Sequence, residues 1–367
     1  MEHKKLGDIA TYVNGYAFKP EDRGTKGLPI IRIQDLTGNS YDLGFYNGEY
    51  PKKIELNNGD ILISWSASLG VYEWNRGKAL LNQHIFKAVF DKLDVNKKYF
   101  VFAVKYNLKE MEKRTHGATM KHITKKDFDN VLVPFPPLNK QQEIAATLDK
   151  LQSIITHRRT QLEKLDLLVK ARFVEMFGDP VLNEKGWKCK RLLDMGSCKN
   201  GMNFHYNDSG IEINCLGVGD FKDFSTINDT SLLPVVSLNE MPSEEYLLKN
   251  DDIVFVRSNG NKALVGRSVA VYPNDTPTTF SGFCIRYRLQ DTSVSVPYLL
   301  RVLKSDDMRL KMAGRGANIQ NLNQQILGTL IIPVPPIELQ NQFAEFVKQI
   351  DKSRFITLKE NKESEIL

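Results

Sequence analysis

The segment NKQQEIAATLDKLQSIITHRRTQLEKLDLLVKARFVEMF runs from Asn139 to Phe177 and contains neither glycine nor proline. Asn139 is the expected N-cap, with Gln142 three residues later as in a capping box, and Gly178-Asp179-Pro180 follows as a helix stop. We therefore expect one helix, roughly 58 Å long at a rise of about 1.5 Å per residue.

This helix needs a partner. Its apolar residues recur at spacings of three, four or seven, which is an a/d pattern sustained over four heptads. A helix this long cannot bury such a seam within one small domain. Arg158 and Arg172 interrupt the seam at d-type positions. The apolar seam positions are Leu148, Leu151, Ile155, Leu162, Leu165, Val169 and Met176.

A duplication of the sequence supplies the partner. The segment KLGDIATYVNGYAF at Lys5–Phe18 reappears as RLLDMGSCKNGMNF at Arg191–Phe204, an offset of 186. The offset grows to 199 towards the end of each copy, so the second copy is the longer one. Such a repeat indicates two related domains. Further matches pair Asn58–Ser66 with Asn250–Ser258 at an offset of 192, and pair His116–Ile123 with Arg315–Leu322, Val133–Leu138 with Ile332–Ile337, and Gln141 with Gln340 at 199.

The second copy also closes on a helix. This helix is expected to begin near Glu338 and to run to Leu367, which aligns with Leu168 of the first helix. We predict an α+β fold in which two duplicated α/β domains are separated by a two-helix antiparallel coiled coil and related by a pseudo-two-fold axis. The seam of the second helix is formed by Phe343, Val347, Ile350 and Arg354.

Strands precede the helix in each copy. Asp60–Ser64 and Asp252–Val256 have the pattern of buried strands entered from a turn. A further strand near residue 286 alternates apolar and polar residues, which predicts one buried face and one basic exposed face. Its expected buried face is Phe283, Ile285, Tyr287 and Leu289, and its expected exposed face is Cys284, Arg286 and Arg288.

The composition limits the function without deciding it. The chain has 367 residues, 41% hydrophobic and 26% charged, and a net charge of +6, which permits nucleic acid as a partner. No run approaches eighteen apolar residues and no apolar leader follows Met1, so we expect a cytoplasmic protein. Four cysteines, with no CxxC spacing, are expected to be free thiols.

Recognisable catalytic signatures are absent from the sequence. It contains no Gly-x-x-x-x-Gly-Lys-Ser/Thr loop, no Gly-x-Gly-x-x-Gly turn and no HExxH or HxH pair. We therefore expect no catalytic residue and no metal site. This moves the interpretation towards a binding protein, although missing motifs do not exclude catalysis.

Loops that occur in both copies are the best candidates for a binding surface. One pair follows the buried strands and is rich in hydroxyl, amide and basic groups, which can donate to phosphates and to base edges. The alternative is an ordinary polar turn. The candidate residues are Ser64, Trp65, Ser66 and Ser68 in the first copy, and Arg257, Ser258, Asn259, Asn261, Lys262 and Arg267 in the second.

A second pair of loops surrounds a shared Gly-Ala dipeptide. Glycine lets backbone amides approach an anion closely, although a simple turn between helix and strand would look the same. A third shared feature is an Asn-Gly turn at Asn14-Gly15 and Asn200-Gly201. In the second loop pair the candidates are Thr119, Lys121, His122 and Lys125 in the first copy, and Arg315, Asn318 and Gln320 in the second.

The whole pattern resembles the specificity subunit of type I restriction–modification enzymes. The resemblance rests on VPFPPLNKQQEI at Val133–Ile144, on FVEMFGDP at Phe173–Pro180, on PVPPIELQ at Pro333–Gln340, and on the two Gly-Ala loops. It covers essentially the whole chain. Single motifs of this kind are weak, but the paired set at a constant offset of 199 is specific.

The resemblance implies a division of labour. Residues 1–138 and 181–337 would be two target-recognition domains, each reading one half of a bipartite double-stranded DNA site, and the helices at 139–180 and 338–367 would space them. Two methyltransferase subunits and restriction or motor subunits would be the partners. This chain would bind no cofactor itself, because S-adenosylmethionine, ATP and Mg²⁺ would belong to those subunits.

Three other functions stay open on the sequence alone. The chain could be the specificity subunit of a fused restriction–methylation enzyme. It could be a self-sufficient DNA-modifying enzyme, which would transfer methyl groups without a partner. It could also be a coiled-coil adaptor, which would show no salt-dependent affinity for DNA.

Overall fold

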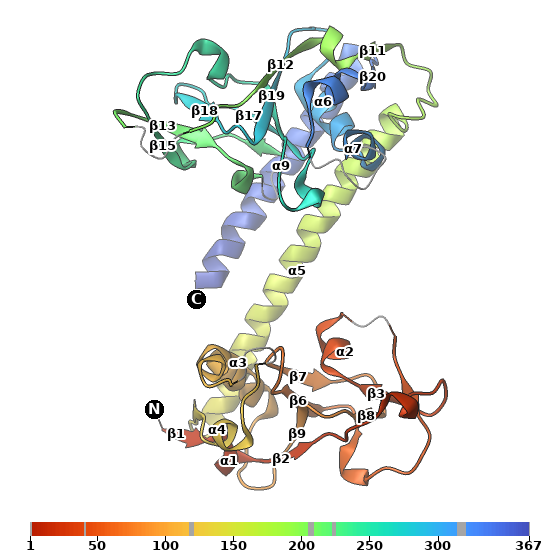
Figure 1. Cartoon of the computed structure of the whole chain (residues 1–367), viewed down its shortest axis with the longest axis vertical. Helices are drawn as coiled ribbons and strands as arrows, with labels where there is room; N and C mark the ends of the chain where they lie inside the picture. Colours follow the sequence, from red (N-terminus) through yellow and green to blue (C-terminus); the bar gives the residue numbers. More distant parts are fainter. Residues whose placement is uncertain are drawn as a thin grey trace. The chain divides into compact units, whose positions relative to one another are not determined.

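The computed structural model describes residues 2–39, 42–116, 121–204, 209–221, 225–313 and 321–366. It contains two compact units, Met1–Thr156 and His157–Leu367, and the division between them falls inside the long helix α5 (Leu138–Phe177). Each unit combines helices with antiparallel and mixed sheets, as expected for an α+β fold (Figure 1).

The first unit contains a four-stranded antiparallel sheet in the order β2-β9-β6-β7, a smaller mixed sheet in the order β4-β3-β8-β5, and the pair β1-β10. Its strands are β1 (His3–Lys5), β2 (Thr11–Asn14), β3 (Leu28–Ile31), β4 (Phe45–Tyr46), β5 (Glu55–Leu56), β6 (Asp60–Ser64), β7 (Gly70–Trp74), β8 (Ala79–Leu81), β9 (Ile85–Val89) and β10 (Leu132–Pro134), and its shorter helices are α1 (Leu6–Ile9), α2 (Ile33–Thr37), α3 (Lys97–Lys113) and α4 (Lys125–Asp129).

The second unit repeats this plan. Its main sheet has the order β12-β19-β16-β17-β14, its smaller sheet the order β15-β13-β18, and β11 pairs with β20. Its strands are β11 (Cys189–Arg191), β12 (Gly196–Asn200), β13 (Ile211–Leu216), β14 (Thr226–Ile227), β15 (Val235–Leu238), β16 (Asp252–Val256), β17 (Ser268–Val271), β18 (Thr278–Phe280), β19 (Cys284–Leu289) and β20 (Ile331–Pro333), and its helices are α6 (Val296–Leu303), α7 (Asp306–Ala313), α8 (Gln324–Gly328) and α9 (Ile337–Ile366).

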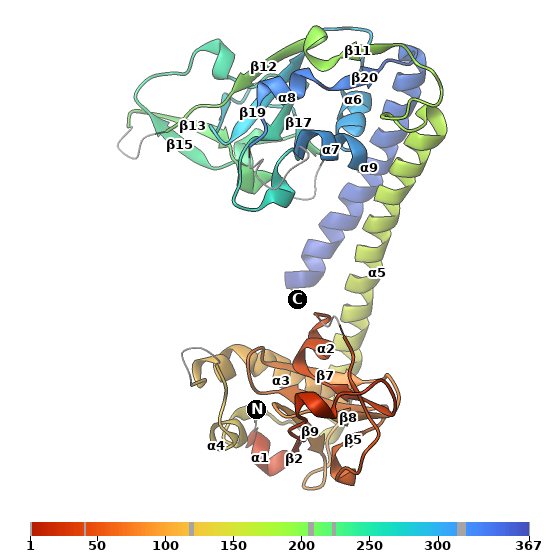
Figure 2. The same ribbon diagram turned by 45° about the vertical axis from the view of Figure 1, so that its right-hand side comes forward.

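The strand registers confirm the duplication. Ile61 of β6 lies opposite Ala88 of β9, and the equivalent Ile253 of β16 lies opposite Tyr287 of β19. These pairs keep the sequence offsets of 192 and 199. Figure 2 shows the strands of each unit from a second direction. The duplicated sequence therefore folds into the same ladder twice.

A buried tyrosine hydroxyl has changed strands between the copies. In the first unit Tyr12 of β2 donates to the Leu6 carbonyl at 3.1 Å. In the second unit Tyr287 of β19 donates to the equivalent Leu192 carbonyl at 2.9 Å, and its cross-strand neighbour is Cys198. The hydrogen bond is kept because a tyrosine on either strand of the pair can reach the same carbonyl.

The proline segments before the long helices are held by buried polar side chains. Gln141 is fully buried, accepts from the Asn96 amide at 3.0 Å and donates to the Pro136 carbonyl at 2.8 Å. Gln340 is also fully buried and makes the equivalent bond to the Pro335 carbonyl at 2.8 Å. The matched glutamines thus fix the start of both helices.

The start of α5 differs from the prediction. The helix begins at Leu138, so Asn139 lies within its first turn and is not the N-cap. Gln142 is exposed, and the buried polar residue of this turn is its neighbour Gln141. The other end agrees with the prediction, because the helix stops at Phe177 and Gly178 has a φ of +75°, which glycine adopts without strain.

Within the second unit, α9 runs antiparallel to the second half of α5. Phe343 of α9 is fully buried and contacts Phe173 and Phe177, with ring centroids 5.5 and 5.6 Å away. Further along, Arg354 of α9 forms an ion pair with Asp166 of α5. Both views in Figures 1 and 2 show the two helices side by side. The predicted pairing of the two helices of one chain is confirmed.

The prediction for β19 is wrong. Cys284, Ile285, Arg286 and Tyr287 are all buried, so this strand has no exposed basic face. It is a central strand covered on both sides, and such strands do not alternate cleanly. Phe283, which was expected on the buried face, precedes the strand and is 60% exposed.

Candidate nucleic-acid interface

The two candidate loops of the first unit lie next to each other. The loop after β6 and the loop after α3 are linked by backbone hydrogen bonds from the Ala67 amide to the Lys121 carbonyl at 2.9 Å and from the Ile123 amide to the Trp65 carbonyl at 3.0 Å. Ser66 lies opposite His122 in an isolated antiparallel bridge. Segments separated by more than fifty residues in sequence therefore form one edge of the unit.

The second unit builds the same edge. Ser258 lies opposite Asn321 in an isolated antiparallel bridge, and the Leu322 amide donates to the Arg257 carbonyl at 2.8 Å. Ser258 and Asn321 are the equivalents of Ser66 and His122 at the offsets of the repeat. The candidate loops thus converge twice, with different side chains each time.

The shared Asn-Gly turns join this edge. Trp65 Nε1 donates to Asn14 Oδ1 at 3.1 Å, and Gln324 Nε2 donates to Asn200 Oδ1 at 3.4 Å. A Cβ on Gly15 would lie 2.0 Å from the Asn82 carbonyl oxygen. A glycine is therefore required by the close approach of two backbones, a reason that the turn pattern alone does not reveal.

Sequence reasoning missed a fourth element of the edge, the turn between β8 and β9 and its counterpart between β18 and β19. The Trp65 amide donates to the His84 carbonyl at 3.1 Å, and the Arg257 amide donates to the Phe283 carbonyl at 2.8 Å. His84 and Phe283 are equivalent positions at the offset of 199. Aligning the copies through these turns would have found them.

The candidate serines differ in what they can offer a ligand. Ser64 and Ser66 are buried, and Ser64 Oγ donates to the Ser68 carbonyl at 2.5 Å. Both hydroxyls therefore shape the loop and are not available at its surface. Ser68 is exposed.

Trp65 is the aromatic centre of the first edge. It stacks on Phe86 at a centroid distance of 5.6 Å, and the rings of His84 and His122 lie 4.9 and 6.5 Å away. Trp65 and His122 are half-buried, while Lys121 is exposed beside them. Aromatic and imidazole groups next to a lysine can stack on bases and neutralise a phosphate.

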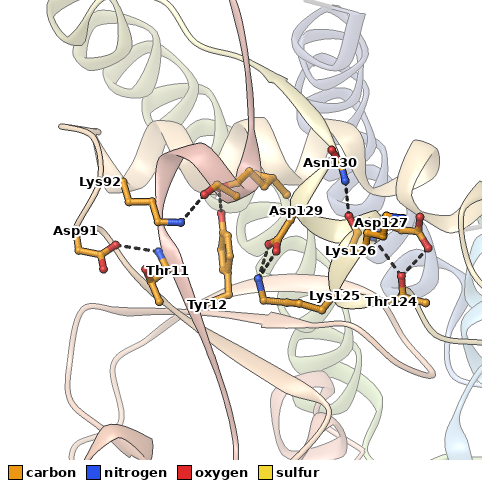
Figure 3. Close-up of polar contacts among 12 residues, drawn as sticks. Thr11, Tyr12, Asp91, Lys92, Thr124, Lys125, Lys126, Asp127, Asp129 and Asn130 are labelled. Atoms are coloured by element: carbon orange, nitrogen blue, oxygen red, sulfur yellow. Dashed lines mark hydrogen bonds and ion pairs between the residues drawn. The ribbon is translucent and has the colours of Figure 1, made fainter.

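Lys125 is engaged within its own domain. Its ammonium forms a 2.5 Å ion pair with Asp129 on the next turn of α4 and lies 5.4 Å from the centroid of the Tyr12 ring (Figure 3). The same view shows that the Thr124 side chain caps α4, because its hydroxyl accepts a hydrogen bond from the Asp127 amide. Hydrogen bonds from Thr124 and then His116 lower the pKa of Asp127. These contacts fix the helix that follows the Gly-Ala loop.

In the second unit the loop after β16 is ordered by its own side chains. Asn259 Oδ1 accepts from the Asn261 amide at 2.7 Å, and Asn261 Oδ1 accepts from the Ala263 amide at 3.1 Å. Arg257 donates to the Gly282 carbonyl at 3.2 Å. These contacts leave the amide nitrogens of Asn259 and Asn261 available to acceptors.

Arg267 lies elsewhere, because its guanidinium donates to the Phe221 carbonyl at 3.4 Å and lines a separate recess. For Lys262 the structure describes only the backbone, at the start of a short helical turn. Four candidates lie outside the described residues, namely Thr119, Arg315, Asn318 and Gln320.

Known proteins resemble this chain in sequence and in fold. The family model for the type I restriction modification DNA specificity domain matches residues 1–165 and 184–367. The chain belongs to this family. The MjaVIII specificity subunit of Methanocaldococcus jannaschii is 25% identical over 342 residues, which cover 86% of this chain and 77% of that protein. The StySPI specificity subunit of Salmonella potsdam is 25% identical over 376 residues, which cover 94% of this chain and 81% of that protein.

Solved structures of type I systems share the fold of this specificity subunit. The S subunit of the type I restriction–modification system from M. genitalium matches with a TM-score of 0.60 at 16% identity, covering 100% of this chain and 93% of that one. A chain from a study of complex assembly and conformational transition of a type I system matches with a TM-score of 0.56 at 14% identity, covering 99% and 94%.

Family membership supports the role of a specificity subunit and none of the three alternatives. Among the residues that the structure describes, no group of three or more His, Cys, Asp or Glu side chains could hold a metal ion. None of the described helices is long and apolar enough to span a bilayer.

Proposed function

We propose that each unit reads one half of a bipartite DNA target through the edge at which its repeated loops converge. The observation that carries this proposal is the twofold occurrence of the edge, with the same backbone pairing at Ser66–His122 and Ser258–Asn321. A common scaffold with different side chains suits two half-sites of different sequence.

The two edges offer different chemistry to DNA. The first carries Trp65, His122 and the exposed Lys121, whereas the second carries Arg257, two asparagines and the exposed ring of Phe283. Asparagine can pair with the N6 and N7 atoms of adenine, and an apolar ring can contact a thymine methyl group or wedge between bases. We infer that the two half-sites are read by different combinations of aromatic, basic and amide side chains.

We further propose that chemistry is performed by partner subunits. Two methyltransferase subunits with S-adenosylmethionine, and restriction or motor subunits with ATP and Mg²⁺, would assemble on this chain in the cytoplasm. The support is family membership together with the lack of catalytic motifs in the sequence. Relatives named as specificity subunits of type I restriction enzymes support the same assembly.

A domain exchange tests the proposal. Residues 1–138 would be replaced by the corresponding segment of a relative, and the methylated sites would be mapped by single-molecule sequencing in cells that also express the methyltransferase subunit. We expect one half-site to change while the other half-site is retained. A change in both half-sites, or methylation without sequence preference, would contradict the proposal.

A point substitution sharpens the same experiment. Phe283→Ala removes the exposed ring from the second edge, and Leu232→Ala, at an 83% exposed position of the same unit, is the matched control. We expect Phe283→Ala to reduce methylation by about 5- to 150-fold, since stacking of one base is worth about 1–3 kcal/mol. Phe283→Ala should relax the sequence preference only at the half-site read by the second unit, which is the half-site that the domain exchange retains.

A further inference from the structure

The second unit contains a recess lined by cations that the proposed function does not use. We call it the cation recess. It has a volume of about 310 Å³ and lies where β17 approaches α6, α7 and the second half of α5. Its lining includes Arg267, Arg301, Lys304, Arg309 and Ser268. The one carboxylate among its described lining residues is Asp166, which is already paired with Arg354.

The four cations of the recess have only neutral hydrogen-bond partners among the described residues. Arg267 donates to the Phe221 carbonyl, Lys304 to Ser225 Oγ at 3.1 Å, and Arg309 to the Ala263 carbonyl at 2.8 Å. Arg301 makes no hydrogen bond or ion pair within that part of the chain. Grouping like charges in this way is unfavourable unless an anion joins them.

Two buried polar atoms of the recess are without partners in the described chain. The hydroxyl of Ser268 is one, and this residue is only 3% exposed. Arg309 Nε is the other. A buried donor without an acceptor is unfavourable, so an acceptor oxygen of a ligand would be stabilised at this place. Both are donors, and both therefore call for the same kind of ligand atom, an acceptor oxygen.

The protonation behaviour of the recess agrees with this geometry. Burial, followed by the charges of Arg301 and Arg354, lowers the pKa of Lys304 to about 8. Burial also lowers the pKa of Arg301 and of Arg309, and neighbouring Arg267 adds to the shift of Arg309. A bound anion would raise these pKa values, adding to the effect of Asp166, Asp306 and Asp351, which already raise them in part.

A larger cavity adjoins the cation recess. It has a volume of about 790 Å³ and shares Asp166, Ser225, Arg301 and Lys304 with the recess. This adjoining cavity lies within the range of small-molecule sites, which are mostly apolar with a few polar groups at one end. Its other walls combine apolar side chains with charged ones, namely Tyr272, Val296, Leu300, Phe343 and Val347 with Glu345, Lys348, Asp351, Lys352 and Arg354.

We propose that the two connected cavities bind a small phosphate-bearing ligand of the nucleotide class. The phosphate occupies the cation recess, where guanidinium and ammonium groups and the Ser268 hydroxyl donate to its oxygens. The base occupies the adjoining cavity against its aromatic and aliphatic walls. The site borders the loop edge of the second unit, since Arg309 of the recess donates to the Ala263 carbonyl, and it would let the specificity subunit bind a small molecule beside its proposed DNA-reading surface.

Calorimetric titration of the full chain with ATP, AMP and inorganic phosphate tests the site. Arg301→Gln removes a recess cation that makes no hydrogen bond in the described chain, and Arg191→Gln, at an exposed position outside both cavities, is the charge-matched control. We expect Arg301→Gln to weaken nucleotide binding at least tenfold without lowering the melting temperature. Arg191→Gln should leave the affinity unchanged.

A second variant separates the base from the phosphate. Ala344→Trp fills the adjoining cavity, so it should abolish AMP binding while inorganic phosphate still binds in the recess. Two results would overturn the proposal. One is no binding of any nucleotide at millimolar concentration. The other is an Arg301→Gln variant whose only defect is a reduced salt dependence of DNA affinity, which would assign the recess to the phosphates of DNA.

Discussion

Among single residues, one buried hydrogen bond is kept in both copies although different strands supply its donor. The tyrosine hydroxyl that bonds to the Leu6 or Leu192 carbonyl comes from β2 in one copy and from β19 in the other. A buried carbonyl must be paired, but nothing dictates which strand supplies the donor. This explains why a residue-by-residue comparison of the copies misses the equivalence.

Gln340 provides a direct test of this buried polar framework. Replacing it with alanine leaves the Ser295 amide and the Ser293 and Pro335 carbonyls without their partner. We expect the free energy of unfolding to fall by at least about 3 kcal/mol, because three backbone groups lose their partner and each buried group left unpaired costs about 1–3 kcal/mol. Hydrogen exchange across residues 284–303 measures it. Gln342→Ala, at an exposed position of the same helix, should change little, and equal losses in both variants would contradict the argument.

Asp291 should make the second unit sensitive to acid. Hydrogen bonds from Lys190 and then Ser293 lower its pKa to about 2, against about 3.9 in an unfolded chain. Between about pH 2 and pH 4 the Asp291 carboxylate therefore stays ionised in the folded chain, whereas it takes up a proton in the unfolded chain. The stabilisation is complete above about pH 4 and is lost as the pH falls towards 2.

Thermal melting of the wild type and of Asp291→Asn at a series of pH values measures this contribution. The difference in melting temperature should be largest at pH 5 and should shrink steadily on acidification. A difference that stays constant between pH 5 and pH 2.5 would show that the Lys190 contact does not favour the carboxylate.

At the scale of elements, the long helices could be predicted because they combine length, a regular seam and clear stop signals. The start of α5 could not be predicted from Asn139, because the buried polar side chain of this turn is Gln141. Gln141 accepts a hydrogen bond from the Asn96 amide, more than forty residues earlier in the chain. The burial of β19 on both faces was also hidden from the sequence. One of its arginines is accommodated by an ion pair, because Arg288 pairs with the fully buried Asp252 at 2.8 Å.

The contact between α5 and α9 should dominate the stability of the second unit. Phe343→Ala removes a fully buried ring that contacts Phe173 and Phe177, and we expect a loss of about 3–5 kcal/mol. Leu167→Ala, at a 64% exposed position of α5, is the control and should cost less than about 1 kcal/mol. Similar losses from the two substitutions in urea unfolding would argue against the pairing.

At the scale of the whole molecule, the duplication is the part of the architecture that the sequence predicts best. Matched segments at offsets of 186, 192 and 199 correspond to matched strands and registers. The convergence of the loops was not predictable, because bridges such as Ser66–His122 join segments that only the folded sheets bring together. Which side chains contact DNA stays a prediction for all the candidate residues.

Two compact units predict two separate unfolding transitions in differential scanning calorimetry. Phe128 is fully buried in the first unit and contacts Tyr12 edge to face at 4.7 Å. Phe128→Ala should lower one transition by several degrees, and Phe343→Ala should lower the other. A single transition that both substitutions lower equally would mean that the units unfold together.

The close backbone approach at Gly15, where a Cβ would meet the Asn82 carbonyl at 2.0 Å, recurs at Gly201, where it would meet the Ser281 carbonyl at 2.1 Å. In both copies a glycine therefore lies directly under the turn between the paired strands, although the three turn residues differ. The turns also differ in backbone conformation, because His84 has a φ of +74° and Phe283 has no positive φ. Transferring the second preference to the first half-site should therefore require a graft of the whole turn, Ser281–Phe283 in place of Asn82–His84, and not the single substitution His84→Phe.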